Sequence, residues 1–345
     1  MPLKRFIAWS VAIAAALAIA GCRRDGRTPV IVYSPHGQAQ LQAFETRFEA
    51  AYPQYDLEPV DLPSQNIPDR LRAERANPQC DVWWGASAVT FAQAADEDLL
   101  EPYTPDWADQ VPADARDPQS RWIGIYETPE VIVYNPQVVA PEQAPRDWDD
   151  LLDPKWQGRI MLRDPGPSDT MRTIFGAMIV RHWAEQNGPE GGYEWLRRLA
   201  VNTRDYPASW DAVLTALNRQ EAALTVWNMP DVKRVVLERG YHLEIVYPAS
   251  GSPVVTDGIA VVRGAPHQAG AHALYDFINT PDNLAFAAAK FYRIPTRRDV
   301  DRATLPEWMR ALTFERMPLD WTLYRKNIRE WMRVWNDQIR GATAQ

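Results

Sequence analysis

Two loops combine residue types that could bind a small charged molecule. Ser34-Pro35-His36-Gly37 and Trp84-Gly85-Ala86-Ser87 each follow a predicted strand and precede a predicted helix. Open α/β sheets bind ligands at such positions, because the backbone N–H groups of the helix start converge there. We therefore expect Ser34 and His36 to bind a negative group and Trp84 to stack on the ligand. Two simpler interpretations stay open: a helix cap with a turn proline, and a buried core tryptophan.

A third loop, from Asp164 to Arg172, contains two prolines and a glycine that stiffen it. Ser168 stands at a natural N-cap position, and Arg172 lies one turn further along the same helix face. A partly buried helix start stabilises an anion by up to about 2 kcal/mol, and a bidentate arginine orients it. Asp169, however, already places a carboxylate in the first turn and repels a phosphate. Either the loop is only well capped, or Ser168, Asp169, Thr170 and Arg172 bind a ligand that also carries a cation.

A fourth loop begins at Trp227-Asn228 and has the same strand-to-helix character. Asp257, in Thr256-Asp257-Gly258, precedes a predicted strand and is suited to pair with a ligand ammonium group. Trp227, Asn228 and Asp257 are therefore expected at the opposite end of the ligand. A solvated turn aspartate before a glycine is the commoner alternative for Asp257.

Catalytic and metal-binding motifs are absent from the sequence. It has no His-Glu-x-x-His, Cys-x-x-Cys, Gly-x-Ser-x-Gly, Walker or Gly-x-Gly-x-x-Gly pattern, and its five histidines lack metal-ligand spacing. We therefore predict no enzyme activity, no metal and no cofactor. A triad assembled in space leaves no sequence signature, so a hydrolase built on His36 and Ser34 stays open.

The elements that must position these loops alternate between strand and helix, which predicts an α/β fold with a largely parallel sheet. One βα series runs from residue 30 to about 95 and a second from about 159 to 279. The apolar block 123–134, broken at Thr128-Pro129, is predicted to pass as a strand between two bodies. From Leu319 on, aromatic and aliphatic residues recur at spacings of three and four, which predicts a helix that packs against the core.

The first residues indicate export. Lys4 and Arg5 precede an uncharged run, 6–20, which is too short for a membrane span of about 20 residues. Ile19-Ala20-Gly21-Cys22 resembles the bacterial lipobox, so residues 1–21 are predicted to be a lipoprotein signal, Cys22 the lipid attachment site and 22–29 a tether. A plain secretory signal is the alternative. With Cys22 acylated, Cys80 has no disulfide partner and is predicted to be a small buried hydrophobe.

Length and charge limit the function classes. The chain has 345 residues, a length typical of about two domains, and a formal net charge of −8. A net acidic protein is repelled by nucleic acid and by anionic lipid surfaces. We therefore predict no nucleic-acid partner.

Several segments together resemble a known family. They are the lipobox, the strand Val30–Ser34, Cys80–Trp84, Val131–Asn135, Asp153–Arg159 and Asp257–His267, in that order. This set resembles the extracellular solute-binding proteins of bacterial ABC importers, in the group that contains ferric-ion, phosphonate and sugar-phosphate binders. The resemblance implies two α/β lobes joined by crossing strands, with a ligand cleft between them. It predicts lobe 1 over 30–129 and 255–300, lobe 2 over 130–254, and a C-terminal helical segment over 301–345.

The resemblance also implies a function. It predicts a monomeric, lipid-anchored periplasmic or cell-surface receptor that closes on a small anionic or zwitterionic solute and delivers it to a membrane permease. The ferric binders use adjacent tyrosines where this chain has Trp227-Asn228, and the phosphorylated-ligand binders show Ser-Gly-Thr where it has Ser168-Asp169-Thr170. A zwitterionic metabolite such as an aminophosphonate is therefore favoured over iron or a simple phosphate. Ferric-ion binding is the first alternative and an exported hydrolase the second.

Overall fold

The computed structural model describes residues 26–340. The predicted signal segment 1–21, with Lys4 and Arg5, and the predicted attachment site Cys22 lie outside the described residues. The first strand begins at Thr28, inside the predicted tether. No helix of the described part is long and apolar enough to cross a bilayer.

Eleven strands are joined by pairing over the described part of the chain: eight follow one another in the order β2-β1-β3-β10-β5-β8-β6-β7, while β4 pairs with β10, and β9 and β11 pair with β5. They are β1 (Thr28–Ser34), β2 (Tyr55–Asp61), β3 (Val82–Ser87), β4 (Leu100–Glu101), β5 (Ile123–Tyr134), β6 (Ile160–Met161), β7 (Thr203–Asp205), β8 (Leu224–Asn228), β9 (Glu244–Val246), β10 (Val254–Val262) and β11 (Ile294–Pro295).

Helices cover the faces of these sheets and connect most of the strands. They are α2 (Gln38–Ala51), α3 (Asn66–Ala73), α4 (Ala88–Asp96), α5 (Asp169–Gln186), α6 (Glu190–Asn202), α7 (Trp210–Asn218), α8 (Met229–Arg239), α9 (Gln268–Ile278), α10 (Pro281–Phe291), α11 (Glu307–Arg310) and α12 (Trp321–Val334).

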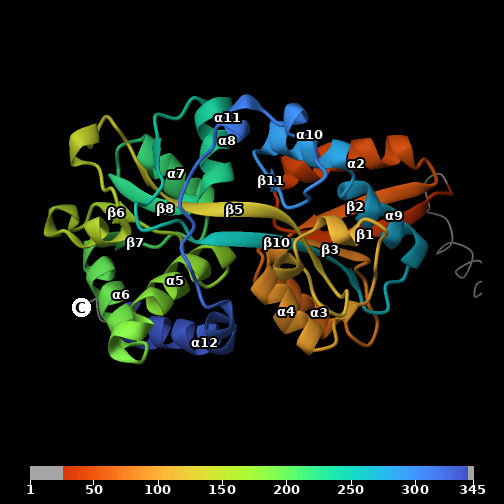
Figure 1. Cartoon of the computed structure of the whole chain (residues 1–345), viewed down its shortest axis with the longest axis horizontal. Coiled ribbons are helices and arrows are strands. Elements are labelled where there is room, and N and C mark those ends of the chain that lie inside the picture. The colour runs from red at the N-terminus through yellow and green to blue at the C-terminus, as the bar shows by residue number, and fades with distance from the viewer. Residues whose placement is uncertain (1–25, 341–345) are drawn as a thin grey trace, which may run out of the picture.

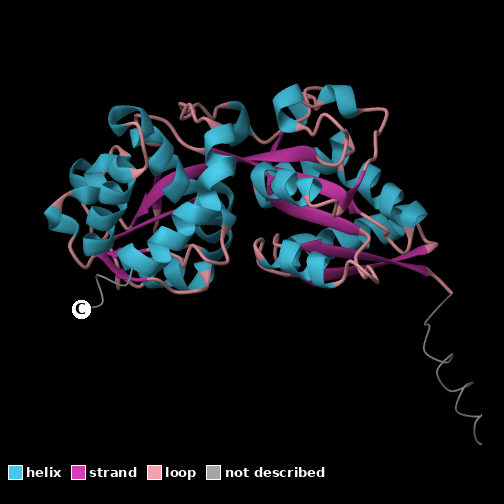
Figure 2. Ribbon diagram, turned by 90° about the horizontal axis from the view of Figure 1, so that it is seen from below, coloured by secondary structure: helices cyan, strands magenta, loops and turns pink. Residues whose placement is uncertain are grey.

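The molecule has two lobes, seen on the two sides of Figure 1. The first lobe holds β1–β4, α2–α4, α9, α10 and β11, and the second holds β6–β9, α5–α8 and α12. The long strand β5 belongs to both lobes: residues up to Pro129 pair with β10, and residues from Glu130 on pair with β8. Figure 2 shows this strand passing between the two helix-covered bodies.

The sheet is mixed, so the expectation of a largely parallel sheet was wrong. β1 pairs in parallel with β2 and β3, and β6 with β7 and β8. β10 runs antiparallel to β3 and β5, and β5 runs antiparallel to β8. The crossing strands reverse direction because the chain leaves the first lobe along β5 and returns to it along β10.

In the first lobe, side chains alternate between the two faces of the sheet. Val30 and Val32 pack under α2 and α9, whereas Tyr33 and Trp83 pack under α3 and α4. This alternation follows from strand geometry, in which successive side chains point to opposite faces. Cys80 is buried and is a free thiol, as the sequence predicted.

The second lobe has its own core, and the C-terminal helix is part of it. α12 packs on α5, and Trp331 and Trp335 are buried in this core. The approach is close: a Cβ added to Gly176 of α5 would lie 2.4 Å from the Tyr324 ring. To reach this position, the chain after β11 passes to α11, near α8, and then runs down across β5 and β10 to α12 (Figure 1). Arg316 forms a backbone bridge with Ser252 on the way.

Two local expectations differ from the structure. β5 is not interrupted at Thr128-Pro129, because the proline falls where the strand passes from one lobe to the other and its missing N–H is tolerated there. Asp257 does not precede a strand but lies inside β10, at an irregularity in its pairing with β3 and β5.

Candidate functional site

A cavity of about 90 Å³ lies between the lobes at the carboxyl ends of β1, β3 and β8. Its wall is polar and comes from both lobes and the crossing strands. The first lobe and the crossing strands contribute Pro35, His36, Ser64, Ala86, Thr128, Val255, Asp257 and Arg293, and the second lobe contributes Arg163, Ser168, Asp169, Thr170, Trp210, Trp227, Asn228 and Asp231.

His36 lines this cavity and has one ring nitrogen without a hydrogen-bond partner among the described residues. Its Nδ1 lies 3.1 Å from Ser34 Oγ, while Nε2 is buried and forms no hydrogen bond among the described residues. Burial lowers the pKa of His36 well below its usual range, and Arg293 lowers it further, so the ring is neutral at pH 7. Gly85 lets the ring pack closely, because a Cβ there would lie 2.5 Å from His36 Cε1.

Two arginines, one from each lobe, supply positive charge. Arg163 follows β6, and its Nε donates to Ala208 O at 3.0 Å. Arg293 follows α10, and its Nε donates to Gln40 Oε1 at 3.3 Å. Among the residues that the structure describes, the terminal nitrogens of both guanidinium groups form no hydrogen bond, so both remain available to an anion. Guanidinium terminal nitrogens suit bidentate contacts with carboxylate or phosphonate oxygens.

Asp257 places a carboxyl group close to the arginines. Thr128 Oγ1 donates to Asp257 Oδ2 at 2.6 Å, and the structure shows no hydrogen bond of Oδ1 within the described residues. Burial raises the pKa of Asp257 to about 6, although Arg293 and the hydroxyl of Thr128 lower it; Asp169 and Asp231 add to the rise. This carboxyl group is mostly ionised at pH 7 and can accept from an ammonium group.

Behind the cavity lies another acidic group. Glu130, on β5, is fully buried, and neither of its carboxyl oxygens has a hydrogen-bond partner in the described part of the chain. Burial raises the pKa of Glu130 well above its usual range, and Asp257 and Asp231 raise it further. Burial therefore favours the protonated, uncharged form of Glu130.

The end of β8 forms the wall on the second lobe. Asn228 caps α8, since its Oδ1 accepts from the Asp231 N–H at 2.9 Å. Asp231 in turn accepts from Trp227 Nε1 at 3.1 Å and from Asn228 Nδ2 at 3.0 Å. The Arg163 guanidinium lies 5.3 Å from the centre of a Trp227 ring, and this cation–π contact orients the guanidinium. These contacts form a rigid wall.

The predicted cap at the start of α5 is present. Ser168 Oγ accepts from the Met171 N–H at 3.3 Å. Ser168, Asp169 and Thr170 all line the cavity. The carboxylate of Asp169, however, points to residues of the first lobe and accepts hydrogen bonds from Ser87 and Thr90.

Three of the predicted site residues do not line this cavity. Ser34 is fully buried beneath His36, and Trp84 packs edge-on against Phe44 and His36 with ring centroids 4.8 Å apart in both pairs. Trp84 is thus the core residue of the simpler interpretation. The Arg172 guanidinium donates to Pro165 O at 3.2 Å and Gly166 O at 2.8 Å, so it holds its own loop together.

Six further residues of the cavity wall were not predicted from the sequence: Ser64, Thr128, Arg163, Trp210, Asp231 and Arg293. Arg163 had a usable signal, since it ends a predicted strand that leads into a helix. Asp231 lies in the first turn of α8, shortly after the predicted binding residues Trp227 and Asn228. Arg293 follows a helix and precedes a two-residue strand, a context without a sequence signature.

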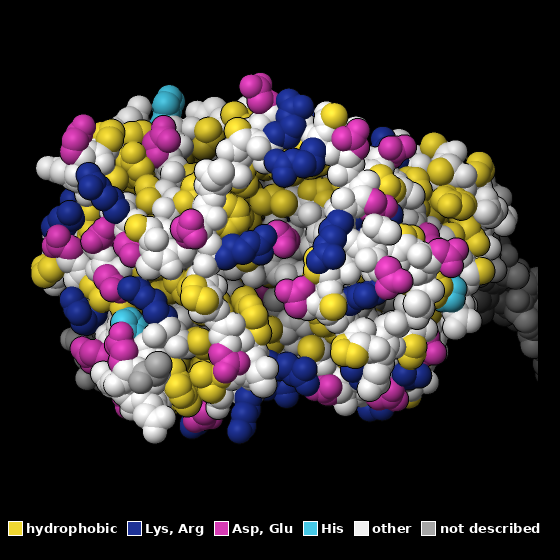
Figure 3. Space-filling view, in the orientation of Figure 1, with side chains coloured by type: hydrophobic (Ala, Val, Ile, Leu, Met, Phe, Trp, Pro, Cys, Tyr) yellow, Lys and Arg dark blue, Asp and Glu magenta, His cyan; other side chains and the backbone are white. Residues whose placement is uncertain are grey.

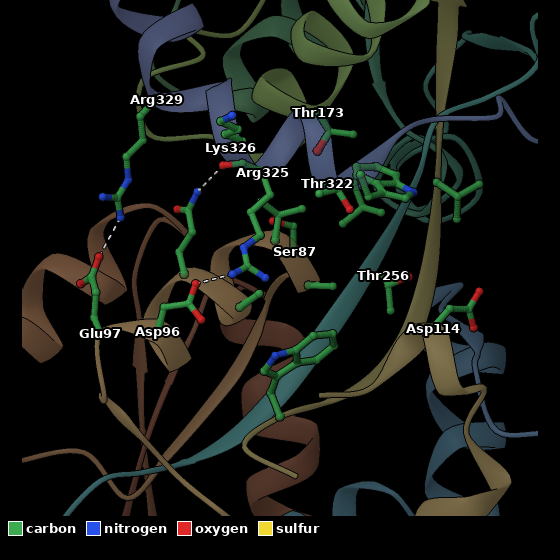
Figure 4. A pocket seen from close by; sticks show the side chains of 18 residues that line it. Ser87, Asp96, Glu97, Asp114, Thr173, Thr256, Thr322, Arg325, Lys326 and Arg329 are labelled. Carbon is green, nitrogen blue, oxygen red and sulfur yellow. Dashed lines mark hydrogen bonds and ion pairs between the residues drawn. The ribbon is translucent and has the colours of Figure 1, made fainter. Parts of the chain in front are cut away.

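A larger cavity, of about 810 Å³, lies between α4 and α12. It shares only Val255 with the small cavity. Figure 4 shows that its charged side chains pair across the lobes: Arg325 with Asp96, and Arg329 with Glu97 at 2.8 Å. In Figure 3, basic and acidic side chains are interspersed over the same face. Because these arginines already have partners, we take the small cavity as the candidate site.

No group of three or more His, Cys, Asp or Glu side chains within residues 26–340 is arranged to hold a metal ion. The Ser34 and His36 pair expected of a hydrolase is present, but no carboxylate hydrogen-bonds to His36 in the described structure, and Ser34 is buried. The chemistry that this wall supports is recognition of opposite charges.

Two lobes with a polar cavity between them define a solute receptor that closes around its ligand. The chain belongs to the bacterial extracellular solute-binding proteins, whose family model matches residues 78–315. Members of this family serve ABC importers, so the partners of this chain are a small solute and a membrane permease. The family acts outside the cell or in the periplasm.

Individual relatives agree with this assignment. A Sinorhizobium fredii protein described as "Probable ABC transporter periplasmic-binding protein" is 25% identical over 331 residues, which cover 94% of this chain and 90% of that protein. A Salmonella typhimurium protein described as "Putative 2-aminoethylphosphonate-binding periplasmic protein" is 25% identical over 240 residues, or 68% of this chain and 67% of that protein. The solved periplasmic binding protein P5PA matches with a TM-score of 0.79 at 22% identity, covering 91% of this chain and 100% of that chain.

Proposed function

We propose that this protein captures a small zwitterionic solute by closure of its lobes, performs no chemistry on it, and delivers it to its permease. One observation carries the proposal: Arg163 and Arg293, from opposite lobes, line the same small cavity as Asp257. The arginines suit a carboxylate, phosphonate or phosphate group, and Asp257 suits an ammonium group. The size of the cavity, about 90 Å³, favours a metabolite of few atoms over a peptide or an oligosaccharide.

When the lobes close, the anionic group of the solute meets the two arginines and its ammonium group meets Asp257. We propose lobe boundaries at 30–129 with 255–300, and at 130–254, with the helical segment from 301 on packed against the second lobe through α12. The change of pairing partner between Pro129 and Glu130 on β5 supports the first boundary. Bending of β5 and β10 near this point would separate Arg293 from Arg163 and open the cavity.

The aminophosphonate class is supported from two sides. The site has partners for both ends of such a molecule. One relative is described as a 2-aminoethylphosphonate-binding protein. Ferric ion is less favoured, since no tyrosine is among the residues that line the described cavity, and Fe³⁺ prefers hard anionic oxygen ligands. A hydrolase is less favoured still, because the described His36 lacks a carboxylate partner.

We also propose that the protein is a monomer attached to a bacterial membrane by lipid on Cys22. The support is the signal-like sequence 1–21, with its lipobox resemblance. Replacing Cys22 with Ser should release the protein into the soluble periplasmic or culture fraction and abolish incorporation of labelled fatty acid. Unchanged membrane attachment of this variant would contradict the lipid anchor.

Thermal unfolding with a panel of solutes tests the binding proposal. Protein without residues 1–21 would be scanned with 2-aminoethylphosphonate, amino acids, sugar phosphates, inorganic phosphate and ferric citrate. A ligand at about 100 times its Kd stabilises the folded state by about 2.7 kcal/mol, which is visible as a higher Tm. The expected result is a response to zwitterions that calorimetry confirms as binding.

Matched variants connect that response to the site. Arg163→Ala and Arg293→Ala should each weaken binding at least tenfold, because a charge-assisted hydrogen bond contributes about 1.5–3 kcal/mol. Arg239→Ala, at the exposed end of α8, is the control that should bind normally. A panel without any response, or equal binding by all three variants, would refute the proposal.

A further inference from the structure

Asp169 connects the two lobes through its side chain. It is the first residue of α5 in the second lobe, yet its carboxylate contacts only first-lobe residues among the hydrogen bonds of the described structure. Oδ2 accepts from the Ser87 N–H at 2.9 Å, and Oδ1 accepts from Thr90 Oγ1 at 3.0 Å and from Gln65 Nε2. The Asp169 N–H donates to Ser64 Oγ at 3.2 Å.

These contacts are not needed to cap α5, because Ser168 already does so. They place the carboxylate at the start of a second helix, α4, whose N-cap is Ser87. The Asp169 side chain is 8% exposed. Burial raises the pKa of Asp169, and the hydrogen bonds from Ser87, Thr90 and Gln65 oppose that rise, as does Arg172. Asp169 thus occupies a position that is suited to an anion and is enclosed by protein except where it lines the cavity.

We propose that Asp169 determines which solutes the cleft accepts, by acting as an anion that the protein itself supplies to the first lobe. The inference rests on the proposed function of the cleft. Because the carboxylate fills the space between Ser64, Ser87 and Thr90, an acidic group of the solute is left with Arg163 and Arg293. The negative charge of Asp169 also repels a solute with no positive group, so a simple phosphate is rejected.

Inorganic phosphate is the probe that tests this assignment without knowledge of the natural solute. The variants are Asp169→Ala and the isosteric Asp169→Asn. The second variant serves as the test if Asp169→Ala does not fold. Asp211→Ala is the matched control: it removes a first-turn aspartate of α7 that pairs with Arg239 inside the second lobe. Each protein would be scanned for thermal unfolding at increasing phosphate concentration.

We expect Asp169→Ala, which empties the space and removes the charge, to gain a phosphate-dependent rise in Tm of about 2 °C or more, and Asp169→Asn, which removes only the charge, to gain a smaller rise, whereas the wild type and the control show none. Adding Thr90→Val to Asp169→Ala should remove most of this gain, because the Thr90 hydroxyl would be a ligand of the phosphate. The assignment is overturned if the wild type responds as strongly as the variants, or if neither variant responds.

The two proposals fail in different ways. If the variants gain phosphate binding but no zwitterion binds the wild type, the proposed function is wrong and the role of Asp169 stands. If a zwitterion binds the wild type and the variants ignore phosphate, the proposed function stands and the role of Asp169 is wrong.

Discussion

Replacing Asp257 with Asn should flatten the pH dependence of stability between pH 5 and pH 7. Burial raises the pKa of the Asp257 carboxyl from 3.8 to about 6 in the folded protein. The folded state therefore binds more protons than the unfolded state in this range, and the free energy of unfolding falls as pH rises. The stabilising contribution of the protonated group is complete below about pH 3.8 and is lost as pH rises through about 6.

The size of the effect follows from these two pKa values. Between pH 7 and pH 5 the folded state takes up about 0.8 of a proton at Asp257, and the unfolded state takes up almost none. The wild type should then gain about 1 kcal/mol of stability from this group over the interval. Asn keeps an oxygen that accepts from the Thr128 hydroxyl, but it does not titrate, so the variant should lack this gain.

Urea unfolding of both proteins at pH 5, 6 and 7 would measure the effect. Glu130 and Asp169, whose pKa values are also raised, face Asp257 together with Asp231 and Arg293, and they contribute to both profiles. The difference between the profiles therefore reports mainly on Asp257. Asp211→Asn, an exposed substitution, should keep the wild-type profile. Parallel profiles of the wild type and Asp257→Asn would refute the reasoning.

Three further predictions concern other parts of the fold. Gly85→Ala should lower stability by about 1–3 kcal/mol, because φ is +95° there and the new Cβ would meet the His36 ring; an unchanged Tm would contradict this. Trp335→Ala should cost about 3–5 kcal/mol in urea unfolding through the cavity it leaves, and a wild-type midpoint would show that the tail is not part of the second core. Asp169→Ala should increase the radius of gyration of the ligand-free protein in X-ray scattering, whereas Asp211→Ala should not; equal radii would contradict a role of Asp169 in closure.

Much of the local structure was predictable from the sequence. The strand expected over 30–34 is present as β1, and Leu41, Phe44 and Phe48, which lie three and four positions apart in the sequence, form the buried face of α2. Ser168 was predicted as the N-cap of α5 and is one. These features depend on neighbours within a few residues, which is the range over which periodicity and capping act.

The parts that were not predictable depend on contacts between distant segments. Strand direction leaves no trace in a hydrophobic pattern, so the antiparallel course of β10 was missed. Trp84 and Trp227 both lie on strands that lead into a helix, yet only Trp227 lines the cavity, because Phe44 of α2 packs against Trp84. The contacts of Asp169 with Ser87 and Thr90 span about 80 positions of the chain and appear only when the lobes meet.

The course of the C-terminal segment limits how the lobes can move. β5 and β10 pair side by side between the lobes, and the segment around Arg316 is joined to Ser252, just before β10, by an isolated bridge. With neighbouring strands about 4.8 Å apart, β5 and β10 form a narrow two-stranded band. Such a band bends readily about an axis across its width but resists torsion along its length. The lobes would thus open and close along one reproducible path. The permease would then meet two well-defined shapes of the receptor, one open and one closed.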